Sequence, residues 1–356
     1  MDAQSLSIDG CEYSTSSLID KIDKVVHSHA PEWERAVYRF MGEWISGSPT
    51  VELMTSGSTG APKTIAVDKQ RMVASALMTQ SALSLRSGMR ALLCLPMEFV
   101  AAKMFVVRCF VSGLDLHIVK PGLSPMADVA GHIDVAAMTP PQLEATLAGG
   151  NLGRIGTLIV GGAPIPDQTE RRLRDARCRV VATYGMTETL THIALRNVNG
   201  PERSEWFAAL PGVAVSLDNR DCLVIDAPAV NPEAVVTNDT AEIAGEGRFR
   251  ILGRSDNVIN SGGLKLSAEA IEEKIRPLMR GRAFFVGPVA DERFGQRPAL
   301  YIDGSPDGFE APDLGSVLEK QEVPACLIFT PRFAYTESGK LRRIETAALA
   351  GTRVSL

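Results

Sequence analysis

Short apolar segments alternate with longer segments of helical periodicity from Val51 to about Asn197. Apolar residues at helical spacing predict helices at Lys69–Leu85 and Ala101–Val111. Strands are expected at Val51–Met54, Ala91–Leu95, Leu116–Val119, Val135–Met138, Thr157–Val160 and Arg179–Tyr184. Such alternation predicts an α/β domain with a largely parallel sheet. The first fifty residues are expected to form a short helical lead-in.

The pattern changes after Asn197. A small β-rich subdomain is indicated by short strands at Ala214–Leu217, Cys222–Ile225, Ala241–Ala244 and Arg248–Ile251. An α+β pattern follows from Ser267, with helices at Ala268–Arg276 and Asp313–Gln321 and strands at Ala283–Val286, Leu300–Ile302 and Ala325–Phe329. We therefore expect a large α/β domain over residues 1–254 and a small α+β domain over residues 255–356.

Composition and charge exclude several classes of protein. The net charge is 37 − 42 = −5, which lacks the basic footprint of a dedicated nucleic-acid binder. The six cysteines form no C-x-x-C pair, so neither a zinc site nor a thioredoxin-like site is indicated, and scattered thiols fit the cytoplasm. The first residues do not resemble a signal peptide, and the apolar runs are too short to span a bilayer.

A loop rich in Gly, Ser and Thr follows the strand expected at Val51–Met54. Its glycines permit close approach of the backbone, and its hydroxyls and amides can form a nest for an anion. The loop consists of Thr55, Ser56, Gly57, Ser58, Thr59, Gly60, Ala61, Pro62 and Lys63. It suits a polyphosphate, although a Walker A loop would place the lysine directly after the second glycine. A flexible Ser/Gly turn is the alternative.

Four motifs in order resemble those of the adenylate-forming superfamily, which includes acyl- and aryl-CoA synthetases, luciferases and peptide-synthetase adenylation domains. They are T-S-G-S-T-G-x-P-K at 55–63, Y-G-M-T-E-T at 184–189, G-R-S-D-N-V-I with G-G-L-K at 253–265, and S-G-K-L-R-R at 338–343. The resemblance implies a large N-terminal domain and a small, mobile C-terminal domain joined by a hinge at Asp256. It also implies that ATP and a carboxylic acid form an acyl-adenylate, from which a thiol, often that of coenzyme A, displaces AMP.

The resemblance implies catalytic roles for three residues. Lys340 would stabilise the negative charge that develops between the carboxylate and the α-phosphate, Thr187 would contact that phosphate, and Glu188 would bind Mg²⁺. A solvated lysine and a glutamate favoured at a helix N-terminus are the alternatives for Lys340 and Glu188.

The remaining motif residues would bind ATP and coenzyme A. The resemblance implies nucleotide contacts for Gly162, Ala163, Tyr184, Gly185, Met186, Asp239 and Arg254, the last two on the ribose. Asn238 stands where the family has a glycine, so the motif around Asp239 departs from the family pattern at this position. Gly262, Gly263 and Lys265 would border the passage for coenzyme A. A simple strand-to-loop turn at 161–164 and a salt-bridged surface Lys265 are the alternatives.

The residues that would contact the acid substrate are expected in and after the segment Leu95–Met104. Many family members have an aromatic or histidine gate residue in the segment that corresponds to Leu95–Met104, and the histidine is absent here. Lys103 and Arg108 are basic residues in an apolar stretch, where charges are rarely unpaired, and they could bind a second carboxylate of the substrate. Side chains that reach solvent are the alternative, above all for Arg108. Gln142 and His192 are further pocket candidates, and a packed histidine is an equal alternative for His192.

The chain looks most like the short o-succinylbenzoate–CoA ligases of bacterial menaquinone biosynthesis. The similarity is carried by L-P-x-x-x-x-A-x-K-M at 95–104, A-M-T-P-P-Q at 137–142 and Y-G-M-T-E-T-x-x-H-I-A-L at 184–195, and by a phosphate loop that begins after only about fifty residues. That substrate has an aromatic ring and two carboxylates, which would suit Lys103. The alternatives are a ligase for another aryl or fatty acid, or for a carrier-protein thiol, and an inert relative that binds acyl-adenylate without turnover.

Overall fold

The computed structural model describes residues 5–54, 64–335, 341–349 and 351–355. The chain divides into two compact units. The first consists of residues 1–215, 225–235 and 244–249, and the second of residues 216–224, 236–243 and 250–356. The second unit therefore includes the C-terminal region together with two segments of the predicted β-rich subdomain. Compactness does not by itself define a domain that moves, so the boundary at residue 254 stays a prediction.

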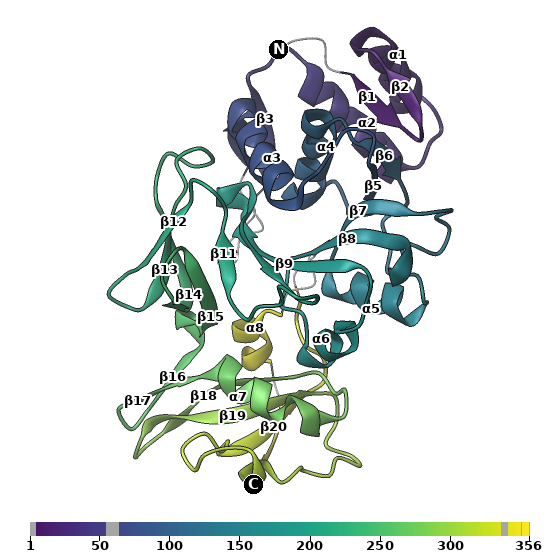
Figure 1. The fold of residues 1–356 in the computed structure, drawn as a ribbon. Coiled ribbons are helices and arrows are strands. Elements are labelled where there is room, and N and C mark those ends of the chain that lie inside the picture. Colours follow the sequence, from purple (N-terminus) through teal and green to yellow (C-terminus); the bar gives the residue numbers. More distant parts are fainter. Residues whose placement is uncertain (1–4, 55–63, 336–340, 350, 356) are drawn as a thin grey trace. The chain divides into compact units, whose positions relative to one another are not determined.

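A large sheet organises the first unit (Figure 1). Its central strands pair in parallel, in the order β1 (Leu6–Ile8), β6 (Asp115–Ile118), β5 (Arg90–Leu93), β7 (Ile133–Met138), β8 (Ile155–Val160) and β9 (Arg179–Met186). The predicted, largely parallel α/β sheet is thus confirmed. Strands β5, β7, β8 and β9 contain long apolar runs because both faces of a parallel sheet are covered.

Antiparallel strands extend this sheet at both edges. β2 (Cys11–Tyr13) pairs with β1, and β10 (Thr191–Asn197) returns beside β9, followed in the strand order by β11 (Phe207–Ala209). Beyond β11 the order continues with β15 (Arg248–Arg254), β14 (Val235–Ile243), β13 (Cys222–Asp226) and β12 (Ala214–Leu217). These four strands confirm the β-rich region that the sequence predicts after Asn197.

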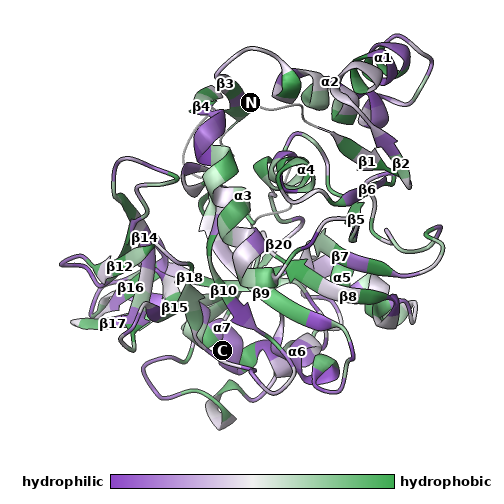
Figure 2. Cartoon of the chain, turned by 45° about the horizontal axis from the view of Figure 1, so that its top comes forward, coloured by the Kyte–Doolittle hydropathy of each residue, from purple (hydrophilic) through white to green (hydrophobic). Residues whose placement is uncertain are grey.

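Helices cover the parallel strands. α5 (Pro140–Ala148) and α6 (Asp167–Leu173) contribute Leu143 and Leu173 to a core formed with β7, β8 and β9. α3 (Lys69–Leu83) and α4 (Val100–Ser112) confirm the two predicted helices. Figure 2 shows that α4 is mostly hydrophobic, and eight of its residues are buried. No helix in the described part of the chain is long and apolar enough to cross a membrane.

The lead-in is partly as predicted. α1 (Thr15–Val26) buries Leu18, Ile22 and Val25 along one stripe, and α2 (Glu32–Ile45) buries a stripe that ends at Trp44. The three-residue strands β1 and β2 were not predicted, because such short segments carry no readable periodicity.

The expected strand at Val51–Met54 forms, but it lies outside the large sheet. β3 (Thr50–Met54) pairs with β4 (Thr64–Asp68) in a separate two-stranded sheet. β4 was not predicted. The segment that connects the two strands, 55–63, lies outside the described residues.

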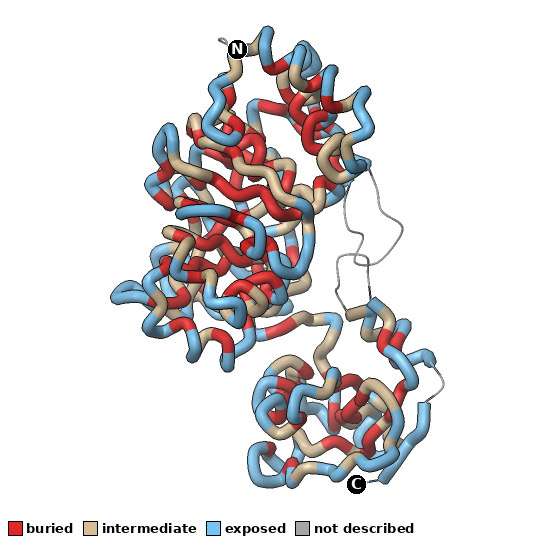
Figure 3. Tube along the Cα trace, turned by 90° about the vertical axis from the view of Figure 1, so that its right-hand side faces the viewer, coloured by how far each residue is buried: buried red, intermediate tan, exposed pale blue. Residues whose placement is uncertain are grey.

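A smaller mixed sheet organises the second unit, in the order β17 (Leu264–Ser267), β16 (Val258–Ser261), β19 (Gly295–Asp303), β20 (Cys326–Thr330) and β21 (Thr352–Ser355), with β18 (Phe284–Asp291) also paired to β19. α7 (Ala268–Ile275) packs its apolar side on this sheet, and α8 (Arg343–Ala348) follows near the C-terminus. Figure 3 shows stretches of buried residues in both the large N-terminal part and the smaller C-terminal part of the trace.

The helix predicted at Asp313–Gln321 is wrong. Only a 3₁₀ turn forms there, at Leu314–Ser316. Gly315 lowers helix propensity by about 1 kcal/mol relative to alanine, and Leu314 and Leu318 reach the core without a regular helix.

Truncation of a central core side chain should test the packing of the large sheet. Leu158 on β8 is fully buried, so Leu158→Ala should lower the free energy of unfolding by about 2–5 kcal/mol. The matched control is Leu123→Ala, because Leu123 is 62% exposed and its truncation should change stability by less than about 0.5 kcal/mol. Urea denaturation followed by tryptophan fluorescence measures both. Equal effects at the two positions would contradict the described packing.

Candidate active site

The Y-G-M-T-E-T segment forms the tight reversal between β9 and β10. β9 ends at Met186, a 3₁₀ turn spans Thr187–Thr189, and β10 starts at Thr191. The buried Thr189 hydroxyl accepts a hydrogen bond from the Met186 N–H (3.0 Å) and lies 2.7 Å from the Thr191 carbonyl oxygen, to which it can donate. The hydrogen bonds of Thr189 therefore stabilise the turn that carries Thr187 and the exposed Glu188.

Backbone strain is concentrated directly after this turn. Leu190 has φ of 57° and Thr191 has φ of 108°. A β-branched residue in that region is a real outlier, and such strain gathers at functional sites. At Gly185 an added Cβ would lie 1.8 Å from the Thr191 carbonyl oxygen, so only glycine allows β10 to return this closely.

The predicted nucleotide-binding residues follow the ends of two neighbouring parallel strands. Gly162 and Ala163 come after β8 and are exposed, while Tyr184, Gly185 and Met186 end β9. Ligands of open α/β sheets bind outside the carboxyl ends of the strands. The ring of Tyr184 packs against two aromatic rings, whose centroids lie 5.9 Å away at Phe207 and 5.2 Å away at Phe249.

A buried polar cluster joins α3, α4 and β10. The Arg108 guanidinium donates from Nε to the Thr79 hydroxyl (3.1 Å) and from Nη2 to the Thr191 hydroxyl (2.7 Å). The Thr79 hydroxyl also lies 2.9 Å from His192 Nε2. Arg108 is only 4% exposed, which excludes the alternative that its side chain reaches solvent. The strained Thr191 thus contacts the one buried cation of α4.

The charge of this cluster is carried by Arg108. Burial lowers the pKa of Arg108 to about 10, so the guanidinium remains protonated at neutral pH. Burial also lowers the pKa of His192 well below its ordinary value, and the charge of Arg108 acts in the same direction, so the imidazole is neutral. No carboxylate among the described residues forms a salt bridge with Arg108.

Lys103 and Gln142 are engaged with the main chain. Lys103 Nζ donates to the Glu52 carbonyl oxygen (2.8 Å). The Gln142 amide nitrogen donates to the carbonyl oxygens of Cys94 (3.1 Å) and Gly122 (2.8 Å), and its oxygen accepts from the Thr139 N–H (3.0 Å). The structure brings Arg108 and His192 together, whereas Lys103 and Gln142 contact main-chain groups elsewhere. Roles of all four on the acid stay predictions.

In the second unit, Asp239 and Arg254 lie together. Arg254 donates to the carboxylates of Asp239 (3.0 Å) and Asp256 (2.8 Å). Asn238, which stands where the family has a glycine, donates to both carboxylate oxygens of Asp256 (3.2 and 3.3 Å). The predicted ribose-binding pair and the predicted hinge residue therefore form one polar network.

The two glycines predicted to border coenzyme A form the turn between β16 and β17. Gly262 and Gly263 have φ of 58° and 88°, which a two-residue hairpin turn of this type requires. A Cβ at Gly262 would lie 2.8 Å from the Phe294 ring. Lys265 is exposed on β17.

Two predicted elements, the phosphate loop 55–63 and Lys340, lie outside the described residues. No cluster of three His, Cys, Asp or Glu side chains suited to a metal occurs within the described ranges. The Glu188 carboxylate fits Mg²⁺, which binds oxygen through one or two carboxylates together with substrate phosphates and water.

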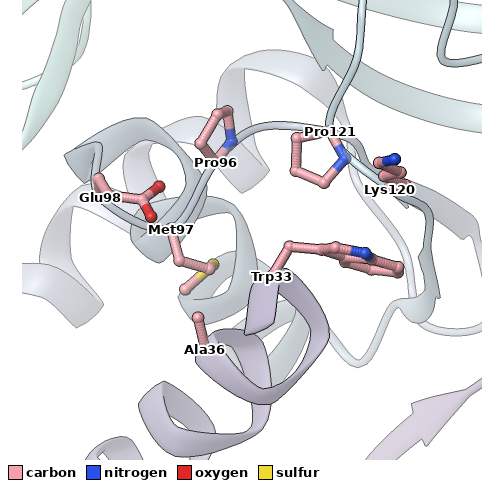
Figure 4. A pocket seen from close by; sticks show the side chains of 7 residues that line it. All are labelled: Trp33, Ala36, Pro96, Met97, Glu98, Lys120 and Pro121. Carbon is pink, nitrogen blue, oxygen red and sulfur yellow. The ribbon is translucent and has the colours of Figure 1, made fainter. Parts of the chain in front are cut away.

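A pocket of about 190 Å³ lies beside the predicted gate segment (Figure 4). Trp33 and Ala36 of α2 line one side, and Met97 and Glu98 line another, with Lys120 at its margin. None of the predicted site residues that the structure describes lines it.

Sequence reasoning missed Thr79 and Thr191. Both are Thr residues without a motif of their own, and only the three-dimensional meeting of α3, α4 and β10 reveals their contacts with Arg108.

Comparison with known proteins gives a family match. The family model described as AMP-binding enzyme matches residues 33–243. The chain is 27% identical over 264 residues to 2-succinylbenzoate–CoA ligase of Escherichia coli, an alignment that covers 70% of this chain and 57% of that protein. The chain thus spans little more than half the length of this curated relative.

Two solved structures are similar. An acyl-CoA synthetase (AMP-forming)/AMP-acid ligase II-like protein from Dyadobacter fermentans is 34% identical, with a TM-score of 0.63, and the match covers 92% of this chain and 96% of that chain. An o-succinylbenzoate coenzyme A synthetase from Bacillus subtilis, in complex with ATP and magnesium ion, is 19% identical, with a TM-score of 0.71, and the match covers 83% of this chain and 69% of that chain. At that identity the second match shows the fold alone.

The buried neutral His192 predicts a loss of stability in acid. Its folded-state pKa lies below the ordinary value of about 6.5, so the unfolded chain binds a proton that the folded chain does not. The contribution to stability is complete above pH 6.5 and is lost as the pH falls toward the folded-state pKa, with a slope of up to about 1.4 kcal/mol per pH unit. Urea denaturation between pH 5 and 7.5 should show a shallower slope for His192→Gln than for wild type. Identical slopes for His192→Gln and wild type would refute this reading.

Proposed function

The chain belongs to the AMP-binding enzyme family, and we propose that it activates a carboxylic acid with ATP and transfers the acyl group to coenzyme A, with o-succinylbenzoate as the acid. The family match supports the adenylation chemistry. The single observation that supports a substrate with two carboxylates is the buried Arg108, whose described partners are all uncharged.

Adenylation solves a leaving-group problem. A carboxylate oxygen attacks the α-phosphorus of ATP, the bond to the bridging oxygen breaks, and pyrophosphate leaves. The sulfur of coenzyme A then attacks the acyl carbon, AMP leaves with the bonding electrons, and the thiol proton passes to solvent. Such catalysis consists mainly of positioning and charge stabilisation.

The chain's own residues divide this work. Thr55–Lys63 would bind the phosphates, Lys340 would stabilise the charge between carboxylate and α-phosphate, and Thr187 would contact that phosphate. Glu188 would hold Mg²⁺, which supplies neutralisation of phosphate charge. Adenosine would lie against Gly162, Ala163 and the Tyr184–Met186 strand end, with Asp239 and Arg254 on the ribose. In the second step Gly262, Gly263 and Lys265 would border the pantetheine arm.

Arg108 would bind the carboxylate that is not activated. A buried charge without an opposite charge is costly, and a ligand carboxylate would remove that cost. Arginine suits this role because its fork of donors matches a carboxylate. Thr79 and Thr191 would hold the guanidinium in place before the acid arrives.

A ligase for another aryl or fatty acid, or for a carrier-protein thiol, is the alternative within the same chemistry, and an inert relative that binds acyl-adenylate is the alternative outside it. A panel of acids separates them. Release of pyrophosphate from ATP and Mg²⁺ should depend on o-succinylbenzoate and should continue with coenzyme A to the thioester. Pyrophosphate release with benzoate or fatty acids but not with o-succinylbenzoate would overturn o-succinylbenzoate as the substrate. If none of the acids triggers pyrophosphate release, the proposed ligase activity is overturned.

Loss of the Arg108 charge should change discrimination between acids. Arg108→Met should raise KM for o-succinylbenzoate about thirtyfold or more, because the second carboxylate loses its partner. KM for a benzoate that lacks the second carboxylate should change less than threefold. The thermal midpoint without acid should stay the same or rise, since an apolar side chain replaces a buried charge. A lower midpoint together with equal losses for both acids would assign Arg108 a purely structural role.

A further inference from the structure

The β3–β4 hairpin, which flanks the predicted phosphate loop in sequence, has little stability of its own. An isolated two-stranded hairpin is marginal in water. Val51, Leu53 and Val67 are at most 3% exposed, so one face packs on the unit, while the alternating residues are exposed. This packing does not provide hydrogen-bond partners for the main-chain groups at the outer edge of β3.

Two charged side chains hold that edge. The Glu52 N–H donates to the Glu43 carboxylate of α2 (3.1 Å), and the Glu52 carbonyl accepts from Lys103 Nζ of α4 (2.8 Å). Glu52 is the middle residue of β3, paired across the hairpin with Ala66. The N–H group of Glu52 is thus bound to α2, and its carbonyl group is bound to α4.

The base of the hairpin is held by a second lysine. Lys69, the first residue of α3 after β4, is 1% exposed. Its ammonium donates to the carbonyl oxygens of Glu43 (2.8 Å) and Ser46 (3.0 Å) and lies 3.3 Å from the Ser46 hydroxyl, so all three of its protons have acceptors. The Lys69 N–H also donates to the Pro49 carbonyl (2.9 Å). Lys69 therefore caps the C-terminal end of α2, where a positive charge is favoured. It also joins the residue that follows β4 to the segment that precedes β3.

The two lysines share their electrostatic environment. The Lys69 ammonium lies 5.8 Å from the Trp44 ring centroid and that of Lys103 lies 5.5 Å from the Phe40 ring centroid. Burial lowers the pKa of both lysines, and the negative charge of Glu43 opposes the shift in both. One glutamate of α2 thus serves both contacts.

We propose that Lys69 and Lys103 are positioning residues that fix the β3–β4 hairpin on α2 and α4, and thereby set where the polyphosphate of ATP is bound. The inference rests on the proposed function for the identity of the ligand, but its structural part concerns the hairpin alone. It gives Lys103 a role different from contact with the acid. A displacement of the hairpin by about 1 Å would be sufficient to weaken phosphate binding and alignment.

The experiment compares Lys69→Met and Lys103→Met with wild type. Methionine approximates the length and apolar stem of lysine but donates no hydrogen bond. Hydrogen–deuterium exchange of the amides of 50–54 and 64–68 should speed up about tenfold or more in each variant, while the amides of β7 and β8 keep their wild-type protection. Binding of ATP with Mg²⁺, measured by calorimetry, should weaken about tenfold, and KM for the acid should change less than threefold.

Two further variants serve as controls. Lys21→Met removes a lysine that also lies over an aromatic ring, 6.0 Å from the Tyr38 centroid, but belongs to α1, and it should leave hairpin exchange and ATP affinity at wild-type values. Lys103→Arg keeps a donor within reach of the Glu52 carbonyl and should restore most of the ATP affinity.

The outcomes separate the two proposals. Unchanged hairpin exchange in both Met variants would overturn the positioning role whatever the enzyme does. Lys103→Met that raises KM for the acid and leaves ATP affinity unchanged would overturn it in favour of acid binding. A third outcome is that the wild type binds ATP but releases no pyrophosphate with any acid, while hairpin exchange is faster in the Met variants. This outcome would support the positioning role and overturn the proposed function.

Discussion

The parallel pairing of β5, β7, β8 and β9 is the constraint on which the candidate site depends. Parallel strands must each be followed by a connection that crosses back, so their carboxyl ends emerge at the same edge. Residues far apart in the sequence are gathered there: the segment after Leu93, the start of α5 at Pro140, Gly161 after β8 and Thr187 after β9. Helices cover the sheet, and polar groups that act on a ligand can be placed on the loops at this edge.

The reversal from β9 to β10 departs from the parallel pattern, and the departure has a structural cost. Thr191 adopts a strained φ, Gly185 leaves no room for a side chain, and the register of β10 shifts between His192 and Ala194. Two contacts of the same segment hold this arrangement. The buried Thr189 hydroxyl ties the turn together, and the Thr191 hydroxyl accepts from Arg108. The strained residue thus links the motif that carries Thr187 and Glu188 to the buried cation of α4.

Sequence reasoning could predict the elements whose signal is local. The apolar runs of β7 and β8 and the periodicity of α3 and α4 predicted those elements because burial on both faces, or along a stripe, is written directly in the residue types. It could not predict that β3 leaves the large sheet, because strand partners are set by tertiary packing. It mistook 313–321 for a helix because Leu314 and Leu318 are core residues without a helix. For the site, the motifs indicated residues that follow β8 and end β9, whereas the burial of Arg108 and its contacts with Thr79 and Thr191 arise only when three elements pack.

Three cations on α3 and α4 illustrate how partner chemistry separates a structural charge from one available to a ligand. Lys69 and Lys103 donate to main-chain carbonyls that need donors, lie over aromatic rings, and share the charge of Glu43. The ammonium groups of both lysines therefore stabilise the fold through these contacts. Arg108 is buried to a similar degree as Lys69, yet its partners are two hydroxyls, and the imidazole beside it is held neutral. Hydroxyls orient a guanidinium without neutralising it, so the positive charge remains for an anion. This contrast supports the two proposals, which place Lys103 on the hairpin and Arg108 on the acid, although both residues are cations of one helix.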